Sequence, residues 1–319
     1  MKQLVMSALL MISFVGFACD NCNVYLSQSP NDYKNSIGLY MRHRLMYGAY
    51  DFFGEMTSVM HAGHGNDPAL WGNDVQEIFQ TFEFRGNYYF KERWKTTVII
   101  PIVNNQQIID DKQRYLIRNI GDPILMQSYQ LYNTKKDTGA SKFSQRVMVG
   151  IGVKLPVGKT NLKYEQGTPN LDLQPGSGSW DMVSYISYGF KINSFGLNAI
   201  SNVKLNGKDH LNYRYGTVIN GSVNLFNDFK INKSTIRILA GSSTELALKD
   251  ASYTAFYNEK TLYDNTGGQI IFANMGMQFF FKKLVLFGEY QHAVSSELNG
   301  FSQLLTKSKL NVGVTYNLK

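Results

Sequence analysis

Two cysteines near the start of the chain are the first residues whose side chains could carry chemistry. Cys19 and Cys22 stand in a C-x-x-C pattern and are the only two cysteines among the 319 residues. Such a pair can form a disulfide, act as a redox couple, or give two thiolates to a soft metal ion such as Cu(I) or Zn²⁺. A local disulfide is the default in an oxidising compartment, and a single pair is only half of a metal site.

A second group of metal-ligating side chains lies in the segment 51–74. Met60, His61 and His64 are close neighbours there. Thioether and imidazole groups together suit copper or zinc, although two histidines in a glycine-rich loop can equally be solvated. Apart from a copper or zinc ion at these two clusters, the sequence predicts no cofactor.

Arrangements that would support catalysis are incomplete. A serine and a histidine on one strand face need a spacing of two residues, which His292 does not have with Ser295 or Ser296. Gly158-Lys159-Thr160 is similar to the end of a phosphate-binding loop, but the glycine required five positions upstream of Gly158 is Val153. We therefore expect neither an enzyme nor a nucleotide-binding protein.

Composition narrows the class of protein. The chain is 44% hydrophobic and 18% charged, with 20 Tyr and 20 Phe, which excludes a disordered chain. No apolar run of about 18 residues follows the N-terminus, so a helical membrane protein is also excluded. The net charge of +8 is scattered along the sequence. This charge suits anionic lipids or solutes, and nucleic acid is not an expected partner.

The N-terminus predicts export. Lys2 precedes an apolar run that ends in Gly16, Phe17 and Ala18, which is the pattern of a secretory signal peptide over residues 1–18. The mature chain would then begin at Cys19, and lipidation of this cysteine is an alternative to its pairing with Cys22. We expect the outer membrane of a Gram-negative bacterium as the destination.

The elements that must position these residues are strands, because apolar and polar residues alternate with a period of two. In residues 146–155, five aliphatic side chains at odd positions face one way, and Arg146, Met148, two glycines and Lys154 face the other. One face suits hydrocarbon and the other suits water. The sequence predicts about twelve such strands, at 36–50, 75–91, 94–103, 122–134, 144–156, 179–191, 194–206, 212–227, 235–248, 268–281, 284–294 and 308–318.

Connections between these strands alternate in length. Segments 51–74, 104–121, 157–178, 249–267 and 295–307 are long, whereas those around residues 91–93, 193 and 282–283 are tight turns. Long loops at one end and short turns at the other are typical of an outer-membrane barrel, with the long loops extracellular and the turns periplasmic. Aromatic residues at strand ends, such as Tyr88 and Trp94, favour a membrane girdle. The alternative is a soluble all-β protein whose aromatic residues form its core.

Eight charged residues fall on the faces that would point into the barrel. They are Arg42, Arg44, Glu77, Glu83, Arg85, Arg146, Lys154 and Arg214. Charge inside a barrel is tolerated only when it is paired or wet, so opposite charges on the first two strands should pair. The set either fills the lumen or forms a constriction that selects solutes.

Four stretches carry a resemblance to a known family. They are residues 80–89 (QTFEFRGNYY), 121–123 (GDP), 150–159 (GIGVKLPVGK) and 174–181 (QPGSGSWD). With them the chain resembles the outer-membrane barrels of the meta-pathway phenol-degradation transporter family, distant relatives of fatty-acid and hydrocarbon uptake channels. The resemblance covers most of the mature chain. It implies uptake of small, often apolar or aromatic molecules and supplies no catalytic residue.

Together these patterns predict an all-β protein, a transmembrane antiparallel barrel of about twelve strands. Residues 1–18 would be the signal peptide, 19–35 a periplasmic segment able to act as a plug, and 36–319 the barrel. The expected function is passive transport of small molecules, and the expected partners are outer-membrane lipids, the cargo and, during biogenesis, the barrel-assembly machinery. The alternative is a non-conducting binding or structural barrel linked to copper or zinc.

Overall fold

The computed structural model describes residues 34–49, 73–134, 143–165, 167–169, 171–254, 259–264, 266–299 and 304–318. These residues form strands and one short 3₁₀ helix, η2 (Leu171–Leu173). The strands are β1 (Ser36–Ala49), β2 (Asp74–Lys91), β3 (Trp94–Ile109), β4 (Lys112–Ile120), β5 (Ile124–Asn133), β6 (Phe143–Lys154), β7 (Asp181–Ile192), β8 (Phe195–Leu205), β9 (Tyr213–Arg214), β10 (Val218–Ile231), β11 (Ser234–Ala247), β12 (Ala251–Tyr253), β13 (Lys260–Leu262), β14 (Gly268–Phe281), β15 (Leu284–Leu298) and β16 (Leu305–Asn317). No helix of the described part of the chain is long and apolar enough to cross a membrane.

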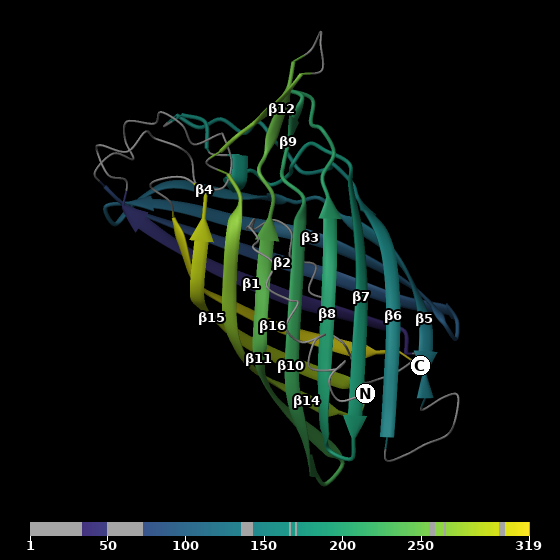
Figure 1. Ribbon diagram of the computed structural model, residues 1–319. Coiled ribbons are helices and arrows are strands. Elements are labelled where there is room, and N and C mark those ends of the chain that lie inside the picture. The colour runs from purple at the N-terminus through teal and green to yellow at the C-terminus, as the bar shows by residue number, and fades with distance from the viewer. Residues whose placement is uncertain are drawn as a thin grey trace, which may run out of the picture.

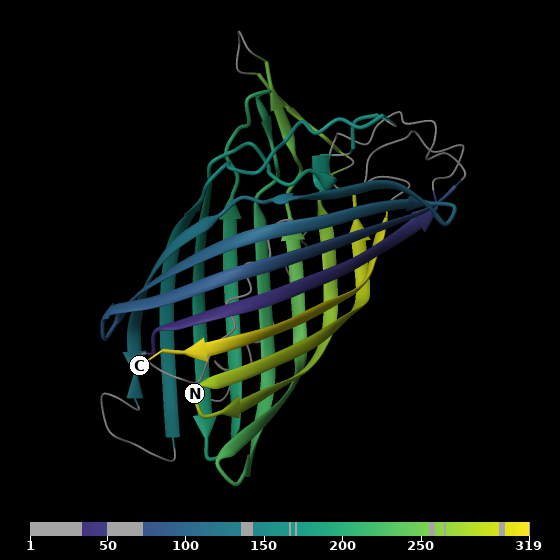
Figure 2. The same cartoon turned by 180° about the vertical axis from the view of Figure 1, so that it is seen from behind.

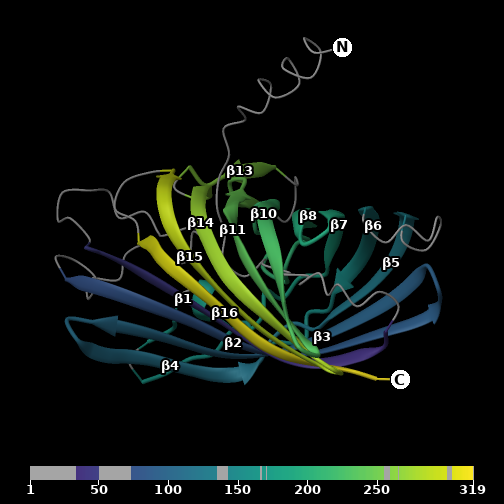
Figure 3. The same cartoon turned by 90° about the horizontal axis from the view of Figure 1, so that it is seen from below.

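Twelve of these strands close into an antiparallel barrel, which confirms the predicted fold. The ring closes where the first strand pairs with the last, with Ser36 of β1 opposite Asn317 of β16. Figure 1 shows β5 to β8 in front of β1 to β3. Figure 2 shows the purple and blue strands β1 to β3 crossing the more upright green strands at a steep angle. Figure 3 separates β2 and β3 on one side of the barrel from β7 and β8 on the other.

The two ends of the barrel differ in their connections. At one end, here called the turn end, most neighbouring strands are joined by two residues, as between β7 and β8, β10 and β11, and β14 and β15. The first residues of these turns are Asn193, Asn232 and Lys282, with φ of 52°, 52° and 48°. Asparagine tolerates this left-handed region better than most residues, which helps these tight reversals. The opposite end, with the longer connections, is here called the loop end.

The burial pattern is inverted relative to a soluble β-protein. Apolar side chains on the outer face are exposed, for example Leu39 at 61% and Ile151 at 56%. Charged side chains on the inner face are buried, for example Arg44, which is 3% exposed, and Glu77, which is 1% exposed. A soluble sandwich would bury the apolar face and expose the polar one. The observed pattern is that of a barrel whose outer wall faces hydrocarbon.

Two predicted boundaries are wrong. Segment 104–121, predicted as a loop, extends β3 and forms β4 after a turn at Asp110 and Asp111. Its run of amide side chains lacks apolar alternation, yet the amides hydrogen-bond along the sheet: Asn104 Nδ2 lies 2.6 Å from Gln80 Oε1. The predicted strand 212–227 is also divided, because residues 213–214 form β9 in a small sheet with β12 and β13, and the barrel strand β10 starts at Val218.

Strands β4 and β5 share one side of β3. β3 pairs with β5 through Trp94 to Ile99 and with β4 through Ile102 to Ile109. The break between β4 and β5 falls at Gly121, Asp122 and Pro123. Strand β6 pairs with β5, and among the described strands β4 pairs with β3 alone. This break is where the connection after β6 attaches to the wall.

Candidate functional site in the barrel lumen

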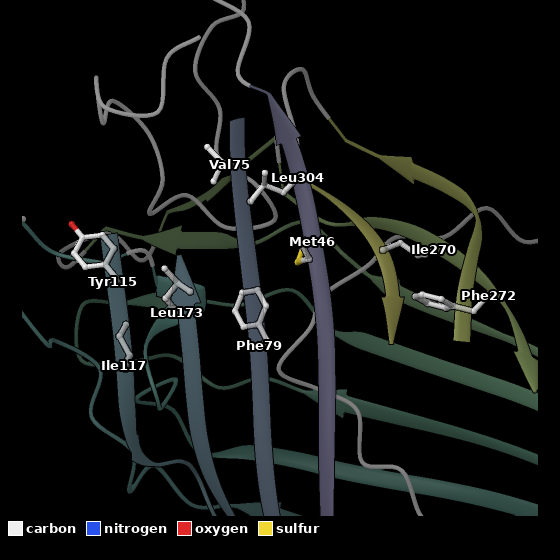
Figure 4. Close-up of a cluster of buried hydrophobic side chains, with 9 residues drawn as sticks. All are labelled: Met46, Val75, Phe79, Tyr115, Ile117, Leu173, Ile270, Phe272 and Leu304. Carbon is white, nitrogen blue, oxygen red and sulfur yellow. The ribbon is translucent and has the colours of Figure 1, made fainter. Parts of the chain in front are cut away.

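The connection from β6 to β7, residues 155–180 and here called the inner segment, folds into the loop end of the lumen. Its η2 residue Leu173 is fully buried in a cluster of apolar side chains that point inward from the wall (Figure 4). The cluster consists of Met46, Val75, Phe79, Tyr115, Ile117, Leu173, Ile270, Phe272 and Leu304. Asn105 of β3 donates a hydrogen bond to the Leu173 carbonyl at 3.1 Å. The mouth of the barrel is therefore lined and narrowed by apolar groups.

Asp122 ties the inner segment to the wall. One of its carboxylate oxygens accepts the backbone N–H of Gly158 at 2.8 Å, and the other accepts that of Ser177 at 2.9 Å. The two ends of the segment thereby meet, and a Cβ on Gly176 would lie 2.4 Å from the carbonyl oxygen of Gly158. Only glycine permits this approach of two backbones. Three of the four stretches quoted for the family resemblance come together at this one point.

Lys154, at the end of β6, joins Asp122 to a second aspartate. The four side chains Asp122, Lys154, Asp181 and Lys204 are here called the anchor. The Lys154 Nζ lies 2.8 Å from Asp122 Oδ2 and 2.7 Å from Asp181 Oδ2 at the start of β7. Lys204 of β8 approaches Asp181 at 3.5 Å. All four side chains are buried, with exposed fractions of 7% or less. Buried ions of opposite sign are costly to separate, so the anchor fixes the segment firmly.

A second ionic cluster joins β1 and β2 further into the lumen. Glu83 Oε1 lies 2.6 Å from Arg42 Nη2, and its other oxygen accepts Arg85 Nε at 2.7 Å. The Arg85 guanidinium also stacks on the Tyr40 ring at 4.3 Å. The predicted pairing of opposite charges on the first two strands is confirmed.

A third cluster spans several strands. Arg44 of β1 pairs with Glu245 of β11 at 2.9 Å, and Lys309 of β16 pairs with the same carboxylate. β1 and β11 are separated in the ring by β16, β15 and β14. The pair therefore reaches across part of the lumen beside the apolar cluster, because Arg44 is in register with Phe79 and Glu245 with Ile270.

A cavity lies between the anchor and the second cluster. Its enclosed volume is about 50 Å³, within about 620 Å³ of space that is partly open to solvent. Apolar side chains of Ile99, Pro101 and Val103 line one part of it. Another part is lined by the cations Arg42, Lys154 and Lys204 together with Glu83 and Asp122, which pair with Arg42 and Lys154. A wall that combines apolar surface with paired charges suits a small molecule that has both an apolar body and a polar group.

The buried carboxylate of Glu289 on β15 is arranged differently. It is 4% exposed and faces inward, and it accepts a hydrogen bond from Gln291 Nε2 at 2.6 Å. Among the described residues it forms no ion pair. Asn311, its register neighbour on β16, has a buried Nδ2 without a hydrogen-bond partner. Glu289 therefore differs from Glu83 and Glu245, which each pair with two cations.

The structure brings most of the predicted lumen residues to the inner face. Arg42, Arg44, Glu77, Glu83, Arg85, Arg146 and Lys154 all lie on the inward side of barrel strands. Arg214 does not: it lies on β9, in the small sheet at the loop end. The prediction failed because alternation continues through residues 212–227 while Gly216 and Thr217 interrupt the strand.

The predicted metal ligands Cys19, Cys22, Met60, His61 and His64 lie outside the described residues. Within the described part of the chain, no group of three or more His, Cys, Asp or Glu side chains could hold a metal ion.

Several residues of the site were missed by sequence reasoning: Asp122, Asp181, Lys204, Glu245 and Lys309. Asp122 and Asp181 stand inside the GDP and SWD stretches, so a signal for these two existed. The partners of Arg44 come from distant strands, and no local pattern marks them.

Comparison with known proteins supports the fold. No protein-family model matches the sequence, and no curated protein matches it. Among solved structures, the COG4313 outer membrane channel from Pseudomonas putida F1 matches with a TM-score of 0.56 and 12% identity, over 91% of this chain and 100% of that one. The β domain of the Bordetella autotransporter BrkA matches with a TM-score of 0.49 and 8% identity, over 89% of this chain and 99% of that one. A Pseudomonas aeruginosa FadL homologue matches with a TM-score of 0.40 and 10% identity, over 90% of this chain and 91% of that one.

The first of these similarities shows a shared fold. Together with the exposed apolar wall and the buried charged lumen, it defines this protein as a β-barrel of the outer-membrane class.

Proposed function

We propose that the protein is a passive outer-membrane channel for small molecules that carry an apolar or aromatic body. The observation that supports this most directly is the cavity beside the anchor, where apolar side chains lie near the paired charges of Arg42 with Glu83 and of Lys154 with Asp122. A solute would first meet the apolar cluster and the Arg44–Glu245 pair at the mouth, and then the Glu83 cluster below them. Nothing in this path requires catalysis or an energy source.

The orientation follows from barrel architecture. The turn end would face the periplasm and the loop end the outside, as in other outer-membrane barrels. Residues 1–18 would direct export and be removed, and assembly would use the barrel-assembly machinery of a Gram-negative cell. The lipid partners would contact the exposed apolar outer face.

The test is ion conductance of the refolded mature chain in planar lipid bilayers. Stable conductance steps, reduced by millimolar benzoate, would support an open path that accepts aromatic solutes. A neutral-lipid bilayer without protein, treated with the same detergent, is the blank. If neither the mature chain nor a variant with a loosened inner segment conducts, the channel proposal is overturned.

A second function has one specific observation in its favour. The inner segment, the apolar cluster around Leu173 and the pair between Arg44 and Glu245 occupy much of the loop half of the lumen. A barrel filled in this way could be a non-conducting binding or structural protein. This alternative predicts silence in the mature chain and steps only after the inner segment is released.

The copper or zinc alternative remains a proposal about residues outside the described part of the chain. Cys19 and Cys22 would supply one pair of soft ligands, and Met60, His61 and His64 another. Isothermal titration of the mature chain with Zn²⁺, compared with a Cys19→Ser/Cys22→Ser variant and a His61→Ala/His64→Ala variant, tests both. Loss of Zn²⁺ binding in either variant would assign the metal site to the substituted residues. Absence of binding in the unchanged chain would reject the metal proposal.

A further inference from the structure

A second pocket lies at the loop end, between the small sheet of β9, β12 and β13 and the ends of the barrel strands β10 and β11. Register places its residues on one face of that sheet: Arg214 is opposite Ala251, Ala251 is opposite Leu262, and Tyr253 is opposite Lys260. Side chains that are directly opposite one another share a face, as do residues two apart along a strand. The short side chain of Ala251 therefore leaves a hollow between Arg214 and Leu262.

The pocket is basic and apolar at once. Arg214, Lys249 and Lys260 supply cations, and Leu248, Leu262 and Tyr253 supply apolar surface. The Lys208 ammonium lies 3.6 Å from the centre of the Tyr253 ring and covers one of its faces. Lys249 is already paired with Asp264 at 2.6 Å. Among the described residues neither Arg214 nor Lys260 forms an ion pair, and no acidic residue lines the pocket. Two cations without acidic partners beside an apolar floor constitute a site for an anion.

The base of this pocket is held in place by a buried carboxylate behind it. Asp250, which is 1% exposed, accepts hydrogen bonds from the Gly216 backbone N–H and the Tyr213 hydroxyl, each at 2.5 Å. Its own backbone N–H donates to Thr266 Oγ1 at 2.8 Å. Asp250 precedes Ala251, so its side chain lies on the opposite face of the sheet from the pocket. The pocket is preformed, which lowers the entropic cost of binding a small ligand.

We propose that this pocket binds a small organic anion, a carboxylate attached to an aromatic or other apolar body. The carboxylate would contact Arg214 and Lys260, and the body would lie over Ala251 against Tyr253 and Leu262. Inorganic phosphate or a lipid phosphate would use the cations but leave the apolar floor uncovered. The site is separate from the lumen, so binding here does not depend on whether the barrel conducts.

Binding can be measured by saturation-transfer NMR and isothermal titration on the full mature chain in detergent, with benzoate as the probe. We expect benzoate to bind at low ionic strength, and benzamide, which lacks the charge, to bind at least about tenfold more weakly. An Arg214→Gln/Lys260→Gln variant should lose about tenfold or more in benzoate affinity. Lys163→Gln, which removes an exposed cation of the inner segment outside this pocket, should leave the affinity unchanged.

Five results would overturn the proposal. They are absence of benzoate binding, equal binding of benzamide, phosphate binding as tight as benzoate, unchanged benzoate affinity in the Arg214→Gln/Lys260→Gln variant, and equal loss in the Lys163→Gln control. Conductance of the double variant, measured separately, reports on the channel proposal alone. Benzoate binding to a barrel that conducts neither as the mature chain nor with a loosened inner segment would therefore support this site while rejecting the channel.

Discussion

At the scale of single residues, the lumen carries charge because most of its buried ions have partners of opposite sign. Glu83 serves two arginines, and Glu245 serves an arginine and a lysine. Removing a shared carboxylate leaves two cations close together in a poorly hydrated place. Removing one of several cations leaves a carboxylate that still has a partner. Substitution of a shared carboxylate should therefore cost more stability than substitution of one of its cations.

Glu83→Gln is expected to destabilise the barrel. The substitution leaves Arg42 and Arg85 without their common counter-ion, which costs about 3 kcal/mol by analogy with broken buried pairs. Urea unfolding in detergent micelles measures the loss. Glu297→Gln, at an exposed position, is the control and should change little. An Arg42→Gln/Glu83→Gln variant should recover part of the stability, and failure to do so would contradict the pairing argument.

Glu289 leads to a prediction about selectivity. Its inward carboxyl forms no ion pair among the described residues, so it attracts permeant cations in a conducting lumen at alkaline pH, where the group is ionised. Glu289→Gln should lower the cation-to-anion permeability ratio by about twofold, because fixed charges near the path set selectivity. The reversal potential in a salt gradient measures the ratio. An unchanged potential in a variant that still conducts would place Glu289 outside the ion path.

At the scale of elements, the inner segment depends on one close contact between backbones. A Cβ at position 176 would lie 2.4 Å from Gly158 O and 2.8 Å from Asp122 Oδ1. Gly176→Val should therefore release the segment from the wall. Trypsin should then cleave at Lys159 or Lys163 faster than in the unchanged protein, and conductance should rise.

The matched control for this change is Gly86→Ala on β2, where an added Cβ meets nothing within 4 Å. This variant should keep the cleavage rate and the conductance of the unchanged protein. Equal protection of the Gly176→Val variant from trypsin would show that the contact does not hold the segment.

The elements also show what could be predicted from the sequence. Strand alternation predicted the twelve-stranded ring because one face of each strand meets hydrocarbon and the other meets polar groups. It failed at 104–121, where both faces carry amides, and at Arg214, where Asp250 and Gly216 hold a separate sheet. Alternation reports on which face a residue occupies. It carries no information about which distant strand supplies the partner of Arg44.

At the scale of the whole molecule, the lumen is layered from mouth to base. The apolar cluster around Leu173 lies at the loop end beside the pair of Arg44 and Glu245, and the Glu83 cluster of β1 and β2 follows below them. A soluble protein is stabilised by apolar side chains buried in its core, but the interior of this barrel is largely polar. Its exposed apolar side chains lie on the outer wall, so hydrocarbon around that wall must supply their burial. The fold therefore depends on the membrane for the burial that a soluble protein obtains from its own core.

This dependence can be tested with two leucines that are similarly exposed. Leu225, in the middle of β10, is 47% exposed on the outer wall, and Leu211, in the connection before β9, is 68% exposed at the loop end. In water the change Leu→Arg would cost little at either position. In a bilayer, Leu225→Arg should destabilise folding by about 2–4 kcal/mol, whereas Leu211→Arg should cost about 0–1 kcal/mol. Urea titration in lipid vesicles measures both, and equal costs would show that the β10 wall does not face hydrocarbon.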